Sequence, residues 1–280
     1  MRRPANAPTR RRRGPWVRLA LLLMLLLYGV PLLWILITSL KSNVEIFANQ
    51  ASVIFKPTLH AYQQIAASGS LGTAMVNSLI IAGGTTLLTT FLGVLTAYGL
   101  ARYRSQLIWW ILGFLILLQM VPQTAEIIPL YHIFAVTGLV NTRLSVVLAD
   151  SALLLPFAIL ILRPFFRNIP IEIEEAAAID GASRLRTFLS VVTPLALNGI
   201  VTEAALVFII AWGEFLYAIS LLSNPGDYPV SAVLSQEIGA YNVSWPGLMA
   251  LAAVGSLPIL IVFLMAQRRL ASGLSLGAVK

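Results

Sequence analysis

The feature that most constrains this chain is a series of six long apolar runs, separated by segments that hold most of its charged residues. A bilayer core about 30 Å thick needs roughly 20 residues of helix to cross it, and each run has about that length. We therefore predict six transmembrane helices, at residues 16–40, 74–100, 107–130, 144–166, 195–222 and 245–266.

The composition excludes a soluble globular protein. Of the 280 residues, 58% are hydrophobic and only 11% are Asp, Glu, Lys or Arg, whereas soluble domains average about 25% charged residues. We expect an all-α, polytopic membrane protein, with a basic tail at residues 1–15 and one membrane domain at residues 16–280. The absence of cysteine from the sequence excludes disulfides and thiolate metal sites.

The distribution of positive charge predicts the orientation. If the N-terminus lies in the cytoplasm, every Lys and Arg except Lys41, Lys56 and Arg143 falls in a cytoplasmic segment. Positive residues accumulate on that side of membrane proteins. We therefore expect a multi-pass protein with both termini in the cytoplasm, and we attribute the net charge of +8 to topology and not to nucleic-acid binding.

The third apolar run contains Pro122, Pro129 and several polar residues. A helix broken at membrane depth is tolerated only where protein or a water-filled cavity covers the freed backbone groups. The sequence leaves two possibilities open for this run, a broken span or a helix that ends near Met120 and continues as an outer loop.

Signatures of enzymes are missing from the sequence. It contains no GxxxxGK[ST] loop for ATP and no GxSxG nucleophile turn. His60 and His132, the only histidines, lie far apart without a paired carboxylate at helical spacing, so we predict no metal site. The chain is expected to be no enzyme.

The longest predicted cytoplasmic loop, residues 167–194, has the pattern helix, break, helix. Asn168 is a candidate N-cap for the first helix, three alanines follow, and Gly181 suits a left-handed residue at its end. The apolar residues after Arg184 recur at helical spacing. Such a loop is suited to docking a partner, although an amphipathic loop resting on the membrane would show similar periodicity.

The loop also carries a family resemblance. Glu175, Ala176, Ala177 and Gly181, followed nine residues later by residues 191–194, resemble the EAA loop of ABC importer permeases. The string IPIEIEEAAAIDGAS is similar to the carbohydrate branch, and segments at 77–79, 129–142, 208–216 and 257–280 resemble the smaller permease subunit of maltose-type importers. The sequence departs from the general loop pattern at Val191 and Thr193, where Ile and Leu are usual. It departs from the carbohydrate branch at Gly213, where Asn is usual.

The resemblance implies the fold of a type I ABC importer permease and a set of partners. These are a second, different permease subunit, two copies of a cytoplasmic ATPase that binds ATP-Mg, and an extracytoplasmic solute-binding protein, in a bacterial cell membrane. The chain itself is expected to bind no cofactor, and a sugar is the expected substrate. The resemblance implies two sets of ATPase contacts: in the loop, Glu174, Glu175, Ala176, Ala177, Asp180 and Gly181, and in the tail, Gly277, Ala278 and Lys280.

Carboxylates inside a span are costly and usually face a cavity or a partner group. Glu203 and Glu214 lie eleven residues apart, nearly on one face of a continuous helix, with Ile210 between them and Tyr217 nearby. We predict that these four residues line the translocation pathway. A packing role for Glu214, an ion-coupled carrier that uses both carboxylates, and an ABC permease for peptides or amino acids remain open alternatives.

Overall fold

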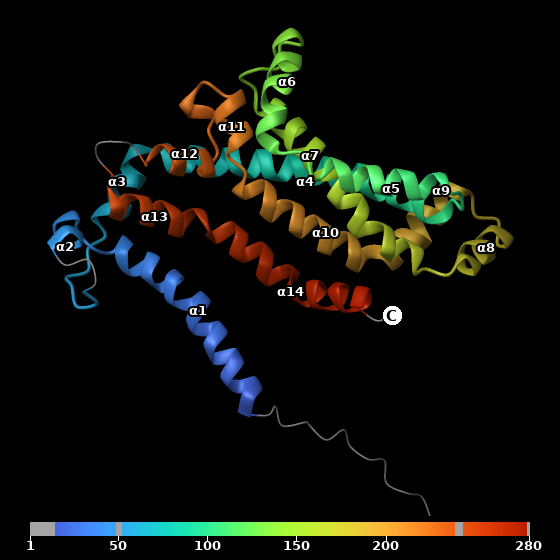
Figure 1. Cartoon of the computed structure of the whole chain (residues 1–280), viewed down its shortest axis with the longest axis horizontal. Coiled ribbons are helices and arrows are strands. Elements are labelled where there is room, and N and C mark those ends of the chain that lie inside the picture. Colours follow the sequence, from blue (N-terminus) through green and yellow to red (C-terminus); the bar gives the residue numbers. More distant parts are fainter. Residues whose placement is uncertain (1–14, 49–51, 239–242, 279–280) are drawn as a thin grey trace, which may run out of the picture.

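The structure, a computed structural model, describes residues 15–48, 52–238 and 243–278, and every regular element in these ranges is a helix. Figure 1 shows an elongated bundle of long helices, with short helices gathered at one end and a small helical hairpin projecting at the other. The all-α prediction is therefore confirmed for the part of the chain that the structure describes.

Five helical segments are long and apolar enough to cross a membrane. They are α1 (Pro15–Ser39), α4 (Ser70–Arg102), α7 (Arg143–Arg167), the continuous segment Arg184–Gly213 that ends in α10 (Thr193–Gly213), and the segment Trp245–Gln267 formed by α13 (Trp245–Gly255) and α14 (Leu257–Ala278). The two helices α4 and α7 extend beyond the expected runs because polar residues at their ends continue the helical hydrogen bonding. Thr142 caps α7 by accepting a hydrogen bond from the amide of Ser145 at 3.2 Å.

The third predicted span is not a straight helix over residues 107–130. It divides into α5 (Leu107–Leu118) and α6 (Gln123–Val136), which are bent by 95° relative to each other. Pro122 has an extended backbone (φ −64°, ψ 127°) and no amide hydrogen to continue α5, so the helix cannot pass through it. Only if this bent pair is counted as one span does the number of candidate spans reach six.

The fifth predicted span also ends earlier than expected. α10 stops at Gly213, and a short helix, α11 (Leu216–Leu221), follows after a break, so residues 195–222 are not one helix. Glu214 has an extended backbone (φ −67°, ψ 134°), which turns the chain away from the axis of α10. The prediction of one continuous helix over residues 195–222 is therefore wrong, although α10 runs without a break from Glu203 to Gly213, directly before Glu214.

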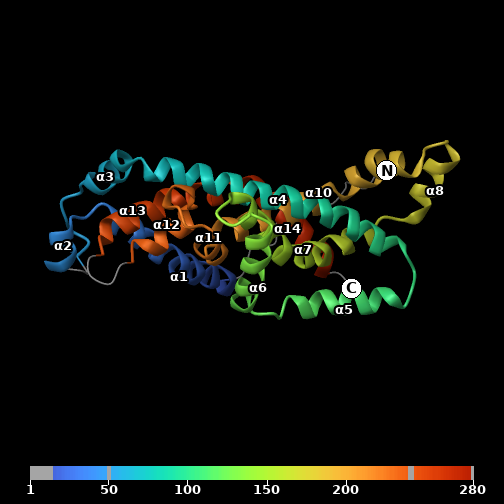
Figure 2. The same cartoon turned by 90° about the horizontal axis from the view of Figure 1, so that it is seen from above.

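The core is formed by α4, α7 and α10, which pack through small residues. A side-chain carbon added at Gly93 of α4 would lie 3.2 Å from Ala158 and 3.3 Å from Leu162 of α7, and one added at Gly199 of α10 would collide with the ring of Phe165. Such contacts let helix backbones approach closely, as in membrane helix pairs generally. In the view of Figure 2, α5 lies beside α7 at the edge of this core.

The helix α1 leans outward and touches mainly α13. No residue in the most apolar stretch of this helix is buried within the chain. In a membrane protein, such a helix is covered by lipid or by another subunit.

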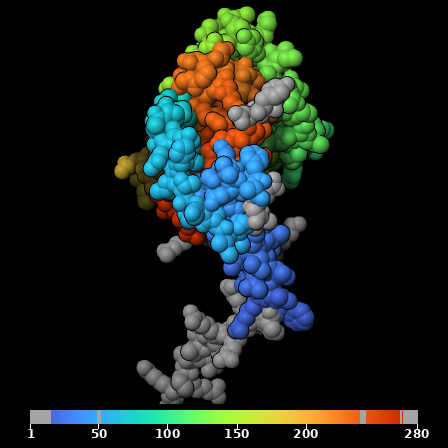
Figure 3. Space-filling view, turned by 90° about the vertical axis from the view of Figure 1, so that its left-hand side faces the viewer, coloured from blue at the N-terminus to red at the C-terminus, as the bar shows by residue number. Residues whose placement is uncertain are grey.

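The two ends of the bundle differ in composition. One end holds α2 (Asn43–Ala48), α3 (His60–Ser68), the turn η2 (Pro225–Asp227) and α12 (Val230–Gln236); Figure 3 shows these elements as one broad face with α1 projecting beneath it. The opposite end holds α8 (Ile171–Ile179), α9 (Arg184–Thr187) and the π-helix η1 (Phe188–Val192), and Figure 1 shows α8 as its outermost element.

Candidate functional site

The helix α8 is the first helix of the predicted docking loop, and local sequence explains its ends. Pro170 is extended (φ −58°, ψ 137°) and stands directly before the helix, with Glu172 and Glu174 in the first turn, where acidic side chains stabilise the helix dipole. Asn168 does not cap α8 as expected; it ends α7 instead. Gly181 takes the left-handed conformation (φ 83°), as predicted, and the amide of Ala182 closes the turn by donating to Ala177 O at 2.9 Å.

Nearly the whole surface of α8 is open. Its side chains are exposed, apart from those of Glu174 and Ala177, which are half-buried. Ile171, Ile173 and Ile179 are 42%, 36% and 86% exposed although they are apolar. The predicted contact residues Glu175, Ala176, Asp180 and Gly181 therefore share an accessible surface.

Glu174 differs from the other predicted contact residues, because its carboxylate turns back to the bundle. Oε1 accepts a hydrogen bond from Nε of Arg102 at 2.6 Å, and Oε2 accepts one from the hydroxyl of Tyr98 at 2.7 Å. The ring of Tyr98 in turn packs against Phe166 and Phe188, with ring centroids 5.8 and 4.8 Å away. Glu174 thus anchors α8 to α4, and its predicted contact with a partner stays a prediction.

The segment after the turn joins the loop to the membrane core without a break. Ser183 caps α9 by accepting a hydrogen bond from the amide of Arg186 at 3.3 Å. Phe188 and Val192 of η1 are buried, while Leu185 and Leu189 of the same predicted apolar series are 67% and 55% exposed. Because η1 continues directly into α10, a displacement of α9 acts on a membrane helix with no loop between them.

The predicted tail contacts are only partly described. Gly277 and Ala278 belong to the last turn of α14. Lys280 lies outside the described residues, as do residues 1–14 of the predicted N-terminal tail.

Glu203, the first predicted pathway carboxylate, is closed off inside the chain. Its side chain is 0% exposed. It lies beside Thr90 of α4, but neither carboxylate oxygen makes a hydrogen bond of ordinary length to another described residue. The prediction that Glu203 lines an open pathway is therefore corrected: the side chain lies between helices of this chain.

Glu214 organises the break between α10 and α11. Its Oε1 accepts hydrogen bonds from Nε2 of Gln123 at 2.7 Å and from the amide of Tyr217 at 3.0 Å. The hydroxyl of Ser231 donates to the carbonyl oxygen of Glu214 at 2.6 Å. The break in the fifth predicted span is thereby tied to the start of α6, where the third predicted span is broken.

Tyr217 also serves this junction and does not face an open pathway. It is 0% exposed, and its hydroxyl donates to Oε2 of Glu126 at 2.6 Å. Asp150 of α7, 1% exposed, faces the carboxyl of Glu214. We call Gln123, Glu126, Asp150, Glu214 and Tyr217 the junction cluster.

Sequence reasoning missed three members of the junction cluster, Gln123, Glu126 and Asp150. Their polarity inside apolar runs was the available signal, but only the bend at Pro122 brings Gln123 and Glu126 to Glu214 and Tyr217. Among the described residues, no three acidic, histidine or cysteine side chains are grouped as a metal site would require.

Ile210, the remaining predicted pathway residue, lies on the surface of the chain near the break between α10 and α11. Ile210 is 41% exposed and Phe215 is 40% exposed, and between them lies the exposed Gly213. A side-chain carbon at Gly213 would meet no atom within 4 Å, so the position has room for a larger residue such as Asn. Ile210 and the half-buried Glu214 are therefore the two predicted pathway residues that reach the surface of this chain.

Comparison with known proteins agrees with this arrangement. Residues 89–276 match the family described as "Binding-protein-dependent transport system inner membrane component". The sulfoquinovosyl glycerol transport system permease protein SmoH of Agrobacterium fabrum is 36% identical, over 92% of this chain and 91% of that protein. The trehalose transport system permease protein SugB of Mycobacterium tuberculosis is 34% identical, over 90% of this chain and 92% of the relative.

The fold also has a close counterpart among solved structures. A chain of a bacterial ABC transporter involved in the import of the acidic polysaccharide alginate superimposes with a TM-score of 0.77 at 22% identity, covering 95% of this chain and 99% of that one. This similarity confirms the predicted importer-permease fold.

Proposed function

Because this chain belongs to the family of binding-protein-dependent transport system inner membrane components, we propose that it is the permease subunit of an ATP-driven importer of a sugar or sugar derivative. The observation that carries the proposal is similarity over about nine-tenths of the chain to permeases named for such solutes, SmoH and SugB. As a multi-pass membrane protein, it forms half of the translocation pathway, and a second, different permease subunit forms the other half.

In this proposal α8 receives the work of ATP hydrolysis. Two copies of a separate cytoplasmic ATPase bind ATP-Mg, and one of them seats α8 through Glu175, Ala176, Asp180 and Gly181, which are exposed together. Ala177, half-buried, leaves the helix thin on the side next to that surface. Driving a transporter from 1:99 to 99:1 between two states needs about 5.5 kcal/mol of differential binding, and this energy comes from the ATPase.

The orientation follows from the same assignment. Both termini and α8 lie in the cytoplasm, where the tail at Gly277, Ala278 and Lys280 is a second ATPase contact. The opposite end, with α2, α3 and the turn η2, faces an extracytoplasmic solute-binding protein. The surplus of positive residues around α8 supports this direction.

The pathway surface of this subunit lies at the junction between α10 and α11. Ile210 and Glu214 reach the surface there, and the exposed ring of Phe215 offers a face for stacking on a sugar. Glu203 and Tyr217 support this surface from inside the chain.

Reconstitution tests the proposal. The chain is purified with the proteins that accompany it in native membrane, placed in proteoliposomes with the ATPase facing out, and assayed for movement of radiolabelled oligosaccharide delivered by the binding protein. We expect transport that requires ATP. Transport driven by a proton or sodium gradient without the ATPase would identify an ion-coupled carrier, and ATP-dependent transport of peptides but not sugars would identify a permease for another solute.

A further inference from the structure

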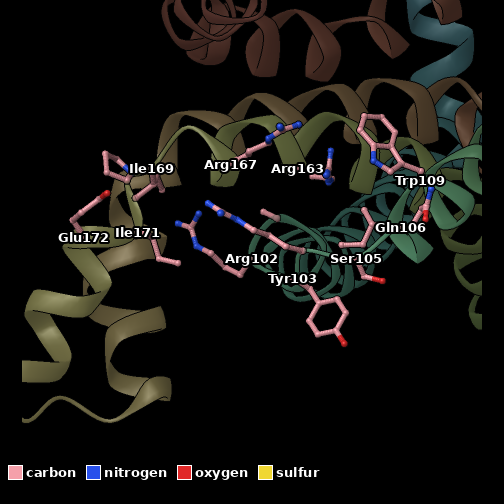
Figure 4. A pocket seen from close by; sticks show the side chains of 14 residues that line it. Arg102, Tyr103, Ser105, Gln106, Trp109, Arg163, Arg167, Ile169, Ile171 and Glu172 are labelled. Atoms are coloured by element: carbon pink, nitrogen blue, oxygen red, sulfur yellow. The ribbon is translucent and has the colours of Figure 1, made fainter.

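A hollow of about 790 Å³ lies where the end of α4, the start of α5 and the α7–α8 connection meet. Figure 4 shows side chains from these segments around it. It lies at the predicted cytoplasmic end, away from the junction cluster and beside the first turn of α8. Its volume is within the range of small-molecule sites in proteins, about 300–1,000 Å³.

The lining of the hollow is strongly basic. Arg102, Arg104, Arg163 and Arg167 line it against one carboxylate, that of Glu172. Arg163 and Arg167 stand one helical turn apart on α7, where like charges repel each other. An anion between them would relieve that repulsion.

Part of the arginine hydrogen-bonding capacity remains unused. Arg102 bonds Glu174 through Nε, but its buried Nη2 has no hydrogen-bond partner among the described residues. Nε of Arg163 donates to Leu100 O at 3.2 Å, and its two terminal nitrogens make no hydrogen bond within the described part of the chain. Guanidinium groups bind phosphate oxygens through such paired donors.

Aromatic side chains place the hollow at the membrane surface. Tyr103 and Trp109, which line it, are 68% and 67% exposed, and the neighbouring Trp110 is 77% exposed. Exposed Trp and Tyr at the end of an apolar helix mark the depth of lipid head groups. An acidic segment of a protein has no comparable reason to meet this aromatic border.

We propose that this hollow binds the phosphate head group of an anionic phospholipid from the cytoplasmic leaflet. Arg104 of the α4–α5 connection and Arg167 at the end of α7, which both line the hollow, bind its phosphate, and Trp109 borders the glycerol and upper acyl region. Basic pockets between membrane helices bind anionic head groups in this way. Because Glu172 and Ile171 of α8 also line the hollow, the lipid would lie against the start of the proposed ATPase-docking helix.

The test uses the complete transporter complex in detergent, titrated with short-chain phosphatidylglycerol and followed by native mass spectrometry. The variant is Arg104→Gln with Arg167→Gln, because both side chains are exposed and their loss should not disturb the core. Each arginine at the surface contributes about 1 kcal/mol to anionic lipid binding, so we expect phosphatidylglycerol to bind roughly 30-fold more weakly. Phosphatidylcholine should bind weakly to both proteins.

A matched control removes two other predicted cytoplasmic charges outside the hollow, Arg18→Gln with Arg186→Gln, and should retain phosphatidylglycerol binding. An equal loss in the control would show unspecific attraction to positive charge and overturn the proposal. Displacement of the lipid by inorganic phosphate at the same concentration would identify a soluble phosphate as the ligand instead. Lipid binding only after removal of the ATPase would assign the hollow to a protein interface. None of these results bears on the proposed transport of a sugar.

Discussion

The α8 loop and the junction cluster contain the same kind of contact in opposite surroundings. In each, a tyrosine hydroxyl donates to a carboxylate, Tyr98 to Glu174 at 2.7 Å and Tyr217 to Glu126 at 2.6 Å. Apart from the half-buried Glu174 and Ala177, the side chains of α8 are exposed, whereas Tyr217 is fully buried among α6, α7 and α11. In the loop, one such contact fixes α8 while most of its surface stays accessible. In the junction cluster, the polar side chains instead form hydrogen bonds that connect the broken helices.

The largest expected effect is that of a substitution at Gly181, in the turn after α8, on ATP-dependent uptake. Replacing Gly181 (φ 83°) by Val forces a β-branched residue into the left-handed region, which costs about 1–2 kcal/mol. We expect ATP-dependent uptake to fall at least about tenfold while the protein still inserts. Uptake in proteoliposomes and the amount of protein in the membrane measure the two quantities.

Gly138→Val is the matched control for this change. Gly138 has a similar backbone (φ 70°) in the turn after α6, with open space around its Cβ position. It should carry the same local strain and keep most of the uptake. Equal losses in both variants would mean that α8 has no special place in transport.

Removing the hydroxyl of Tyr98 or of Tyr217 tests how the burial of each tyrosine–carboxylate contact affects its contribution to stability. Tyr217→Phe removes the donor that the buried Tyr217 offers to the half-buried Glu126, and we expect the free energy of unfolding to fall by about 1.5–3 kcal/mol, the range for hydrogen bonds to charged groups. Tyr98→Phe should cost less stability but more coupling between ATP hydrolysis and uptake. Thermal unfolding in detergent and the ratio of ATP hydrolysed to solute moved distinguish the two. A larger stability loss for Tyr98→Phe would reverse the comparison.

Two ion pairs at opposite ends of the bundle should also differ in how much they stabilise the fold, the more sheltered pair contributing more. Arg102–Glu174 is sheltered, with side-chain exposures of 16% and 15%, while Arg143–Asp227 is more open, at 36% and 27%. We expect Arg102→Gln to lower the free energy of unfolding by roughly 1.5 kcal/mol, and Arg143→Gln to lower it by less than about 1 kcal/mol. Chemical denaturation of both variants at low and high salt makes the measurement, and the Arg143 effect should shrink with salt.

The smallest expected effect concerns Glu45 of α2, a half-buried carboxylate that lies far from the junction cluster. Oε1 of Glu45 accepts a hydrogen bond from the amide of Lys56 at 3.0 Å, and this bond, followed by the one from the amide of Ser42, lowers the pKa of Glu45 below its ordinary value. Its contribution to local stability is present above the ordinary pKa and is lost as pH falls through the lowered value.

Hydrogen exchange at the amide of Lys56 measures this contribution. Protection, corrected for intrinsic exchange rates, should fall slightly on acidification below pH 4.5, the ordinary pKa of glutamate. In the variant Glu45→Gln it should be low and independent of pH. A pH dependence that survives in the variant would assign the effect to another group.

Sequence patterns predicted the parts of this protein that depend on local chemistry. The apolar runs identified the main membrane helices, and Gly181 marked the end of α8 because only a left-handed residue closes that turn. The break at Glu214 could not be foreseen, because nothing in the neighbouring residues forbids a helix there. It arises from hydrogen bonds to Gln123 and Ser231, which are distant in sequence.

The same limit applies to the surroundings of Glu174 and Glu203. A surface glutamate and an anchoring glutamate look alike in sequence, and only the position of Arg102 and Tyr98 distinguishes Glu174. Burial of Glu203 depends on the packing of α4 against α10, which helical spacing alone does not define.

The unbroken run Arg184–Gly213 makes a stiff rod of 30 residues, about 45 Å long at 1.5 Å per residue. One end of this rod adjoins the turn after α8 and the other lies at Glu214. Because the rod is stiff, a displacement of the first end along its axis moves the second end by a similar distance. Distance measurements between spin labels at the two tips should therefore report a constant length through the ATP cycle, while each tip moves against α4.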